Sequence, residues 1–186
     1  MKKELRIWTI GHSTRDLSEF VGLLNVNEIE ALADVRSYPG SRRYPQFNAD
    51  TLAASLASAR IDYVAFTQLG GRRRPRADSP NTVWRNKAFR GYADHMETAE
   101  FKDGITDLIE LARRKRTAIM CAEAVWWRCH RSMISDFLKV AGVTVEHIMD
   151  REGKNVVHPF TSAAQIENGK LVYGSQPEPI PDQRLF

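Results

Sequence analysis

Short apolar runs alternate along the chain with segments whose apolar residues recur every three or four positions. The apolar runs predict strands at 5–10, 29–35, 61–66, 117–121 and 143–149. The amphipathic segments predict helices near 17–24, 48–59, 89–98, 102–115 and 129–141. Strand–helix alternation of this kind predicts an α/β fold, a Rossmann-like three-layer arrangement in which helices cover both faces of a mostly parallel sheet.

Residues at the expected element ends support these boundaries. Asp16, with Glu19 three residues later, is a plausible N-cap and capping partner, and Asn48 can cap the second helix. Gly142 is a C-terminal stop for the last helix. Asn168-Gly169 is a hairpin-type turn, which predicts one or two short strands between 156 and 172.

The 186 residues suit one domain. We expect a single α/β domain over 1–174, with a basic loop at 68–88 inside it. Residues 175–186 carry three prolines and are expected to form a C-terminal arm.

The composition excludes several classes of protein. With 42% hydrophobic and 27% charged residues the chain is not disordered as a whole. Two cysteines cannot build a disulfide framework, which favours a reducing compartment. The first apolar stretch is too short for a secretory signal, and no run approaches the ~20 residues of a membrane span. We therefore expect a cytoplasmic protein with no membrane partner.

The positive charge is concentrated in one segment. The whole chain carries +4, from 27 Lys and Arg against 23 Asp and Glu, whereas residues 68–88 hold six basic residues and one acidic residue. This patch predicts an anionic partner, either a small molecule or a nucleic acid. Its candidate nucleic-acid contacts combine cations with one aromatic ring for base stacking: Arg72, Arg73, Arg74, Arg76 and Trp84. A solvated arginine-rich loop is the structural alternative.

Chemically capable residues follow the expected strands. His12 comes after the first, Asp34 ends the second, Gly70-Gly71 follow the third, and Cys121 ends the fourth. Ligands of open α/β sheets bind outside the carboxyl ends of the strands. If the strands are parallel, these residues share one edge of the molecule.

The densest group of such residues is the segment 121–131. Cys121 or Cys129 is the candidate nucleophile or redox thiol, and His12, Asp34 or Glu123 would handle protons. The candidate anion-binding residues surround them: Arg36, Ser41, Gly70, Gly71, Arg128, His130 and Arg131. In the alternative, purely structural interpretation, Cys129 packs as a small apolar residue and Arg131 forms a bridge to Glu123.

Known motifs limit the reaction classes. Cys121, Glu123, Cys129 and His130 are all competent metal ligands, and His12 is a further candidate. A gap of seven residues between the cysteines is not the paired spacing of structural zinc sites, so we expect neither a metal nor a cofactor. A single open site with three ligands is the alternative. Glycine-rich dinucleotide and P-loop signatures are missing, and the sixth residue after Cys121 is Trp127 rather than the arginine of a cysteine phosphatase loop.

Taken together, five motifs resemble the domain-of-unknown-function 488 family over about residues 8–149. They are Thr9-Ile10-Gly11-His12-Ser13, Asp34-Val35-Arg36 with Pro39 and Ser41, Leu69-Gly70-Gly71, Phe89-Arg90-Gly91-Tyr92-Ala93, and Cys121-Ala122-Glu123 with Cys129-His130-Arg131. The resemblance implies a small, mostly prokaryotic α/β protein and names no reaction.

Two functional hypotheses follow from these residues. The first is a small enzyme that binds a phosphate-bearing ligand, a nucleotide or nucleic acid, in a Cys/His/Arg cleft. The second is a noncatalytic nucleic-acid-binding or sensing module that uses the arginine-rich loop. The sequence leaves the substrate, the strand order and the oligomeric state open.

Overall fold

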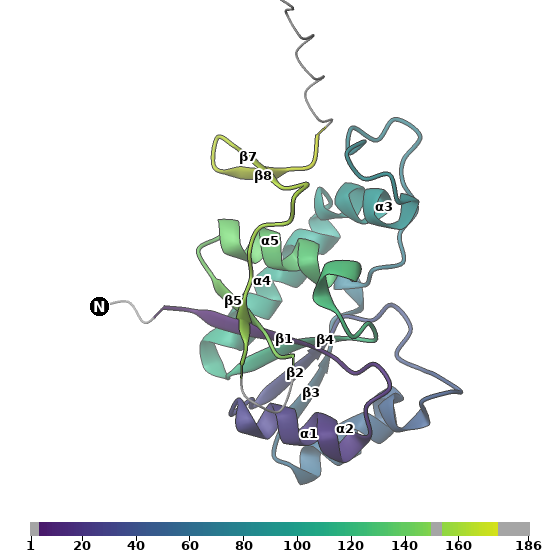
Figure 1. The fold of residues 1–186 in the computed structure, drawn as a ribbon, viewed down its shortest axis with the longest axis vertical. Helices are drawn as coiled ribbons and strands as arrows, with labels where there is room; N and C mark the ends of the chain where they lie inside the picture. The colour runs from purple at the N-terminus through teal and green to yellow at the C-terminus, as the bar shows by residue number, and fades with distance from the viewer. Residues whose placement is uncertain (1–3, 150–153, 175–186) are drawn as a thin grey trace, which may run out of the picture.

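Six strands pair into one mostly parallel sheet in the computed structural model, which describes residues 4–149 and 154–174 (Figure 1). Their order is β3-β2-β4-β1-β5-β6. The first five strands are parallel, and β6 pairs antiparallel with β5. The strands are β1 (Arg6–Gly11), β2 (Ala31–Asp34), β3 (Asp62–Ala65), β4 (Thr117–Cys121), β5 (Thr144–His147) and β6 (Val156–Val157).

Among the described residues, five α-helices cover the two faces of this sheet. Helices α1 (Leu17–Val26) and α2 (Ala49–Ser58) lie on one face. Helices α3 (Lys87–Met96), α4 (Ala99–Arg114) and α5 (Arg131–Val140) lie on the other (Figure 1). The expected three-layer α/β fold is confirmed.

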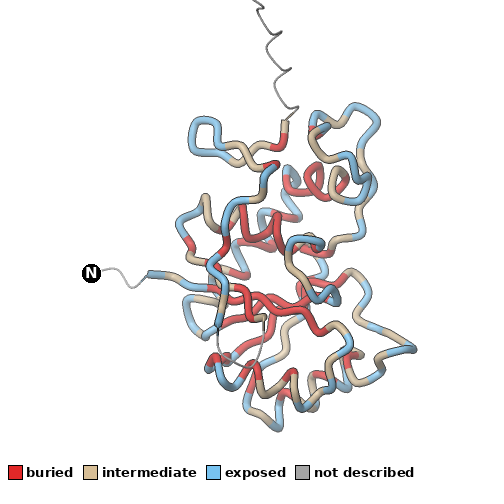
Figure 2. Tube along the Cα trace, viewed as in Figure 1, coloured by how far each residue is buried: buried red, intermediate tan, exposed pale blue. Residues whose placement is uncertain are grey.

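The hydrophobic core is divided into two parts by the sheet. Alternate residues of β1 point to opposite faces, so Ile7 packs on the α3–α5 side while Trp8 and Ile10 pack on the α1–α2 side. All five residues of β4 are buried, and Figure 2 shows the central strands as the most buried part of the chain. Strands buried on both faces require continuous apolar runs, which is the pattern that the sequence carries.

The element ends follow the sequence signals, with one exception. The Asp16 carboxylate accepts the amide N–H of Glu19 at 2.6 Å and caps α1, and Gly142 ends α5 with φ +81°. Asn48 stands at the N-cap position of α2, but its side chain does not cap the helix. Its Oδ1 accepts the amide N–H of Ser41 at 2.6 Å instead, so Asn48 fixes the preceding loop.

A hairpin follows the sheet. Strands β7 (Gln165–Glu167) and β8 (Lys170–Val172) pair through Asn168 and Gly169, both with positive φ as a type I′ turn requires. This confirms the predicted turn. The expected arm at 175–186 lies outside the described residues.

The strand order brings the chemically capable segments together. From β1 the chain moves through α1 to β2 and β3, then returns to place β4 between β2 and β1. Cys121 pairs with Gly11 and Met120 with Asp34, so β1, β2 and β4 end at one edge. The connections that follow β1 and β4 lead to opposite faces of the sheet, through α1 and α5 respectively, and such a switch creates a crevice at that edge.

Within the described part of the chain, no helix combines the length and apolar character needed to cross a membrane.

Candidate functional site

A cleft of about 250 Å³ opens at the carboxyl edge of the sheet. Its walls come from four segments: the loop after β2, the basic loop, the start of α3 and the connection from β4 to α5. The sequence predicted that residues distant in the chain would meet at this edge, and the cleft is formed there.

Two sulfurs and one imidazole form the floor of the cleft. His130 Nδ1 lies 4.0 Å from Cys121 Sγ and 3.7 Å from Cys129 Sγ. Its Nε2 lies 3.1 Å from the carbonyl oxygen of Val35. A carbonyl can only accept, so Nε2 donates to Val35, and Nδ1 is the ring nitrogen that faces the sulfurs. The three ligand atoms lie within 4.8 Å of one another, which makes this the part of the cleft able to hold a metal ion.

The two thiols differ in acidity. Burial by itself raises the pKa of Cys129, but the Cys121 hydrogen bond and the charges of His130 and Arg131 outweigh burial and hold this pKa well below its usual range. The hydrogen bond to Cys129, together with burial, raises the pKa of Cys121 well above its usual range. Of the two, Cys129 is the more acidic thiol.

Arg131 lies behind the floor rather than in the cleft. Its side chain is 1% exposed. Its guanidinium donates to Cys129 Sγ at 3.4 Å, to Thr9 Oγ1 at 3.4 Å and to the carbonyl oxygen of Glu123 at 2.5 Å. Both sequence interpretations of Arg131 therefore need correction: it does not face the ligand, and it binds the backbone of Glu123 rather than the carboxylate. Its role is to hold the β4–α5 connection and the Cys129 sulfur in place.

A buried hydrogen-bond chain continues from Arg131 across the sheet. Thr9 Oγ1 lies 2.7 Å from His147 Nδ1, His147 Nε2 lies 2.9 Å from His158 Nδ1, and His158 Nε2 lies 2.9 Å from Asp136 Oδ1. The Asp136 carboxylate accepts, so His158 donates to it from Nε2, and Arg131 donates to Thr9 Oγ1 at the other end. The chain thus joins a buried cation to a buried carboxylate.

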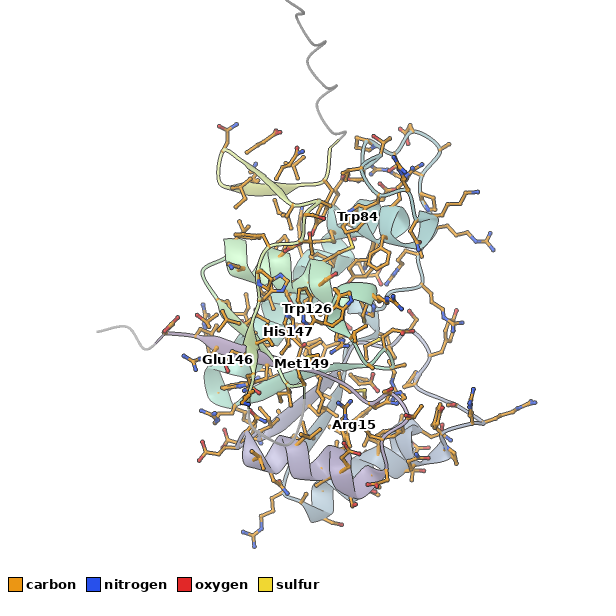
Figure 3. All side chains as sticks on the ribbon, viewed as in Figure 1. Arg15, Trp84, Trp126, Glu146, His147 and Met149 are labelled. Atoms are coloured by element: carbon orange, nitrogen blue, oxygen red, sulfur yellow. The ribbon has the colours of Figure 1, made fainter. Side chains whose placement is uncertain are left out.

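The sequence patterns do not predict this hydrogen-bond chain. In the sequence, His147, His158 and Asp136 stand among apolar residues on three separate segments. Only the fold shows that these segments lie together. Trp126 covers the chain, with its ring stacked on His147 at 4.3 Å between centroids (Figure 3). By contrast, its neighbour Trp127 is largely exposed.

Two of the expected proton-handling residues instead support Arg36. Asp34 accepts from the Arg36 guanidinium at 2.6 Å and from the Tyr63 hydroxyl at 2.7 Å. His12 stacks on Phe47 with 4.3 Å between centroids, and its Nε2 lies 3.4 Å from Arg36 Nη1. Burial lowers the pKa of His12 to about 4. Neither His12 nor Asp34 lines the cleft, whereas Arg36 and Glu123 do.

The remaining anion-binding candidates have mixed positions. Gly71 and Arg128 line the cleft, but Gly70 and Ser41 do not. The Ser41 hydroxyl accepts the amide N–H of Tyr44 at 3.1 Å and thereby shapes the loop before α2. A Cβ at Gly70 would lie 2.5 Å from Ser37 Oγ, so this glycine permits close packing of two loops.

The basic loop is anchored to α3 and α4. Asp94 of α3 accepts from the amide N–H of Arg76 at 2.8 Å and from Asn81 Nδ2 at 2.8 Å. Arg73 pairs with Glu100 at 3.1 Å, and Arg76 pairs with Glu97 at 2.8 Å.

Of the nucleic-acid candidates, Trp84 stacks on Phe89 with 5.1 Å between centroids and meets Tyr173 edge-on, so it is packed into the protein. Arg72 and Arg74 remain exposed.

These features define a three-layer α/β protein with a thiol–imidazole cluster at the carboxyl ends of its strands. The family model described as "Domain of unknown function DUF488" matches residues 16–138, and the chain belongs to this family, as the resemblance predicted. No curated protein and no solved structure matches the chain significantly.

Proposed function

We propose that the protein is a small enzyme that binds a phosphate-bearing ligand in the cleft and acts on it at the Cys121–Cys129–His130 cluster. The observation that carries this proposal is the placement of Arg72 and Arg128, which have no carboxylate partner in the described part of the chain, on a cleft whose floor is that cluster. Arginine suits this task because its planar guanidinium matches the geometry of a phosphate group.

Two of the rim arginines supply the free charge. Arg72 and Arg128 are exposed, and neither pairs with a carboxylate among residues 4–149 and 154–174. Arg36 contributes less charge because Asp34 neutralises it inside the protein. The two exposed arginines are therefore the groups on which phosphate affinity should depend.

An exposed aromatic ring at the mouth of the cleft favours a nucleotide over a simple phosphate. Tyr38 lines the cleft and is 70% exposed, with the Arg72 guanidinium 5.5 Å from its ring centre. Its ring can stack on a base while the arginines hold the phosphate.

The contacts of the basic loop weaken the noncatalytic alternative. A sequence-independent nucleic-acid surface needs free cations and exposed stacking rings. Here Arg73 and Arg76 are paired with glutamates, and Trp84 is packed against Phe89. Three of the five residues expected to contact nucleic acid are therefore already engaged within the protein.

Calorimetric titration with inorganic phosphate and with a nucleoside monophosphate tests the binding step. We expect Arg128→Ala to weaken the affinity by about 10-fold or more, since a hydrogen bond to a charged group contributes roughly 1.5–3 kcal/mol. Arg43→Ala, an exposed arginine outside the cleft, is the matched control and should leave the affinity unchanged.

Two outcomes would contradict the proposal. One is that neither phosphate probe binds. The other is that only long oligonucleotides bind, with a steep salt dependence, which is the behaviour of an electrostatic nucleic-acid module. The enzymatic part is tested by ³¹P NMR of every phosphate-bearing compound that binds. Consumption should disappear in Cys129→Ala and persist in Arg43→Ala.

A further inference from the structure

The floor of the cleft has the composition of a transition-metal site. Cys121, Cys129 and His130 offer two sulfurs and one imidazole nitrogen, the donors that zinc prefers in proteins. They come from two segments, the end of β4 and the turn before α5, so the seven-residue gap between the cysteines does not separate them in space.

The two sulfur–nitrogen distances are close to those around one tetrahedral ion. With zinc–sulfur bonds of about 2.3 Å and zinc–nitrogen bonds of about 2.0 Å, a sulfur and a nitrogen on one ion lie about 3.6 Å apart. The two sulfur–nitrogen distances here are 3.7 Å and 4.0 Å. Closing the remaining gaps requires small shifts of side chains that already face one another.

A supporting set of hydrogen bonds is already in place. Metal-binding histidines usually donate their second ring N–H to a carbonyl or carboxylate, which fixes the ring and its tautomer. His130 does this through Nε2 and the carbonyl oxygen of Val35, and so presents Nδ1 to the two sulfurs. Arg131 Nε, 3.4 Å from Cys129 Sγ, adds an N–H donor to one of the sulfurs.

The surroundings leave one side of the cluster open. Cys121 and Cys129 are only 8% and 3% exposed, yet both line the cleft together with His130. We propose that Cys121, Cys129 and His130 bind one zinc ion whose fourth coordination position opens into the cleft. Three protein ligands and one open position are typical of catalytic rather than structural zinc.

The proposed zinc site deepens the proposed function and rests on it for its role. An ion at the floor would coordinate water or a phosphate oxygen at its open position, while Arg72 and Arg128 hold the rest of the phosphate group. The charge is consistent with an anionic ligand: two thiolates neutralise Zn²⁺, and the buried guanidinium of Arg131 lies against Cys129 Sγ.

Cobalt substitution tests the site directly. The purified protein is reduced, its two thiols are counted, and Co²⁺ is titrated in. We expect one equivalent to bind, with the visible bands of tetrahedral Co²⁺ and the near-ultraviolet charge-transfer band of thiolate ligands. Adding Zn²⁺ should bleach the spectrum. Replacing any one ligand should weaken Co²⁺ binding by more than the about 10–100-fold that loss of a supporting hydrogen bond costs. The variants are Cys121→Ser, Cys129→Ser and His130→Gln.

A measurement on the unaltered protein avoids the risk that these variants misfold. Saturating Zn²⁺ should slow the reaction of both thiols with a disulfide reagent, and a chelator should restore the rate. Zn²⁺ should also raise the melting temperature, because an ion that binds only the folded state stabilises it. If the thiol rates do not change with Zn²⁺, or if Co²⁺ binds without a thiolate band, the zinc site is wrong.

Arg128→Ala separates this inference from the proposed function. We expect this variant to keep the cobalt spectrum and lose phosphate affinity. Phosphate binding by a protein that takes up no metal would refute the zinc site and leave the phosphate cleft intact. Metal uptake without any phosphate binding would support the zinc site and refute the proposed function.

Discussion

Two glycines allow the floor of the cleft to form. A Cβ at Gly11 would overlap the carbonyl oxygen of Glu123, and a Cβ at Gly71 would overlap the ring of His130. Neither has a positive φ, so what each position requires is space rather than an unusual backbone conformation. The closeness of the basic loop to His130 thus depends on one missing methyl group.

Gly71→Ala should therefore displace His130. We expect a loss of about 1–3 kcal/mol in the free energy of unfolding, because an added methyl in a packed site forces its neighbours to move. Cobalt uptake should also weaken, and urea denaturation together with the cobalt titration checks both effects. Gly22→Ala is the matched control: it lies in α1 with no atom within 4 Å of a new Cβ, so it should be neutral or slightly stabilising. Equal behaviour of the two variants would contradict this account.

At the scale of elements, helix α5 holds the segment that follows β5. Besides His158, the Asp136 carboxylate accepts from the amide N–H of Thr161 at 2.9 Å and from the Tyr173 hydroxyl at 2.8 Å. The segment 154–174 adds only the two-residue β6 to the sheet. Its attachment to the α/β core therefore depends strongly on one buried side chain.

Asp136→Asn should release this segment. The amide keeps the size of the carboxylate but replaces one acceptor oxygen with a donor, which leaves buried donors unsatisfied. We expect a loss of about 2–4 kcal/mol in the free energy of unfolding. Hydrogen exchange should accelerate most within 156–173. Asp107→Asn, on the exposed face of α4, should change stability by less than about 0.5 kcal/mol. Uniform exchange throughout Asp136→Asn would argue against a local clamp.

At the scale of the whole molecule, the buried histidine chain links folding to pH. His147 is fully buried, and its burial, with nearby His158 and Arg131, lowers its pKa to about 3. In the unfolded chain the same side chain has a pKa near 6.5. Between these values the unfolded state binds a proton that the folded state does not, so stability falls as pH decreases through this range.

His147→Gln removes this one contribution while the carboxylates continue to titrate. Between pH 7 and pH 4 the variant should lose less stability than the unaltered protein, by on the order of 2–3 kcal/mol. Urea denaturation at several pH values measures the difference. Parallel stability curves for the two proteins would show that His147 is not buried in its neutral form.

The arrangement of elements was predictable because burial and backbone geometry act locally. Strands such as β4 are buried on both faces and must be apolar throughout, and Asn168-Gly169 adopts the positive φ angles that its hairpin needs. The convergence of His12, Asp34 and Cys121 at one edge followed from parallel pairing alone.

The direction of each side chain was not predictable from the same patterns. Arg131 was expected to face the ligand, but it points into the core because the carbonyl of Glu123 and Thr9 satisfy its donors there. The spacing of the cysteines argued against a metal, since sequence rules assume ligands on one short loop. Spacing does not show that the fold brings Cys121, at a strand end, beside Cys129 and His130, at a helix start.

The order of apolar and polar residues by itself determined the three-layer fold and the edge of the sheet where the chemically capable residues lie. Both depend on periodicity and on the common direction of parallel strands. Only the tertiary structure decided which groups face the cleft, how Cys121, Cys129 and His130 come together, and that Asp136 is linked to Arg131 through two histidines. Those contacts join residues up to 138 positions apart, as between Thr9 and His147, and no local pattern encodes them.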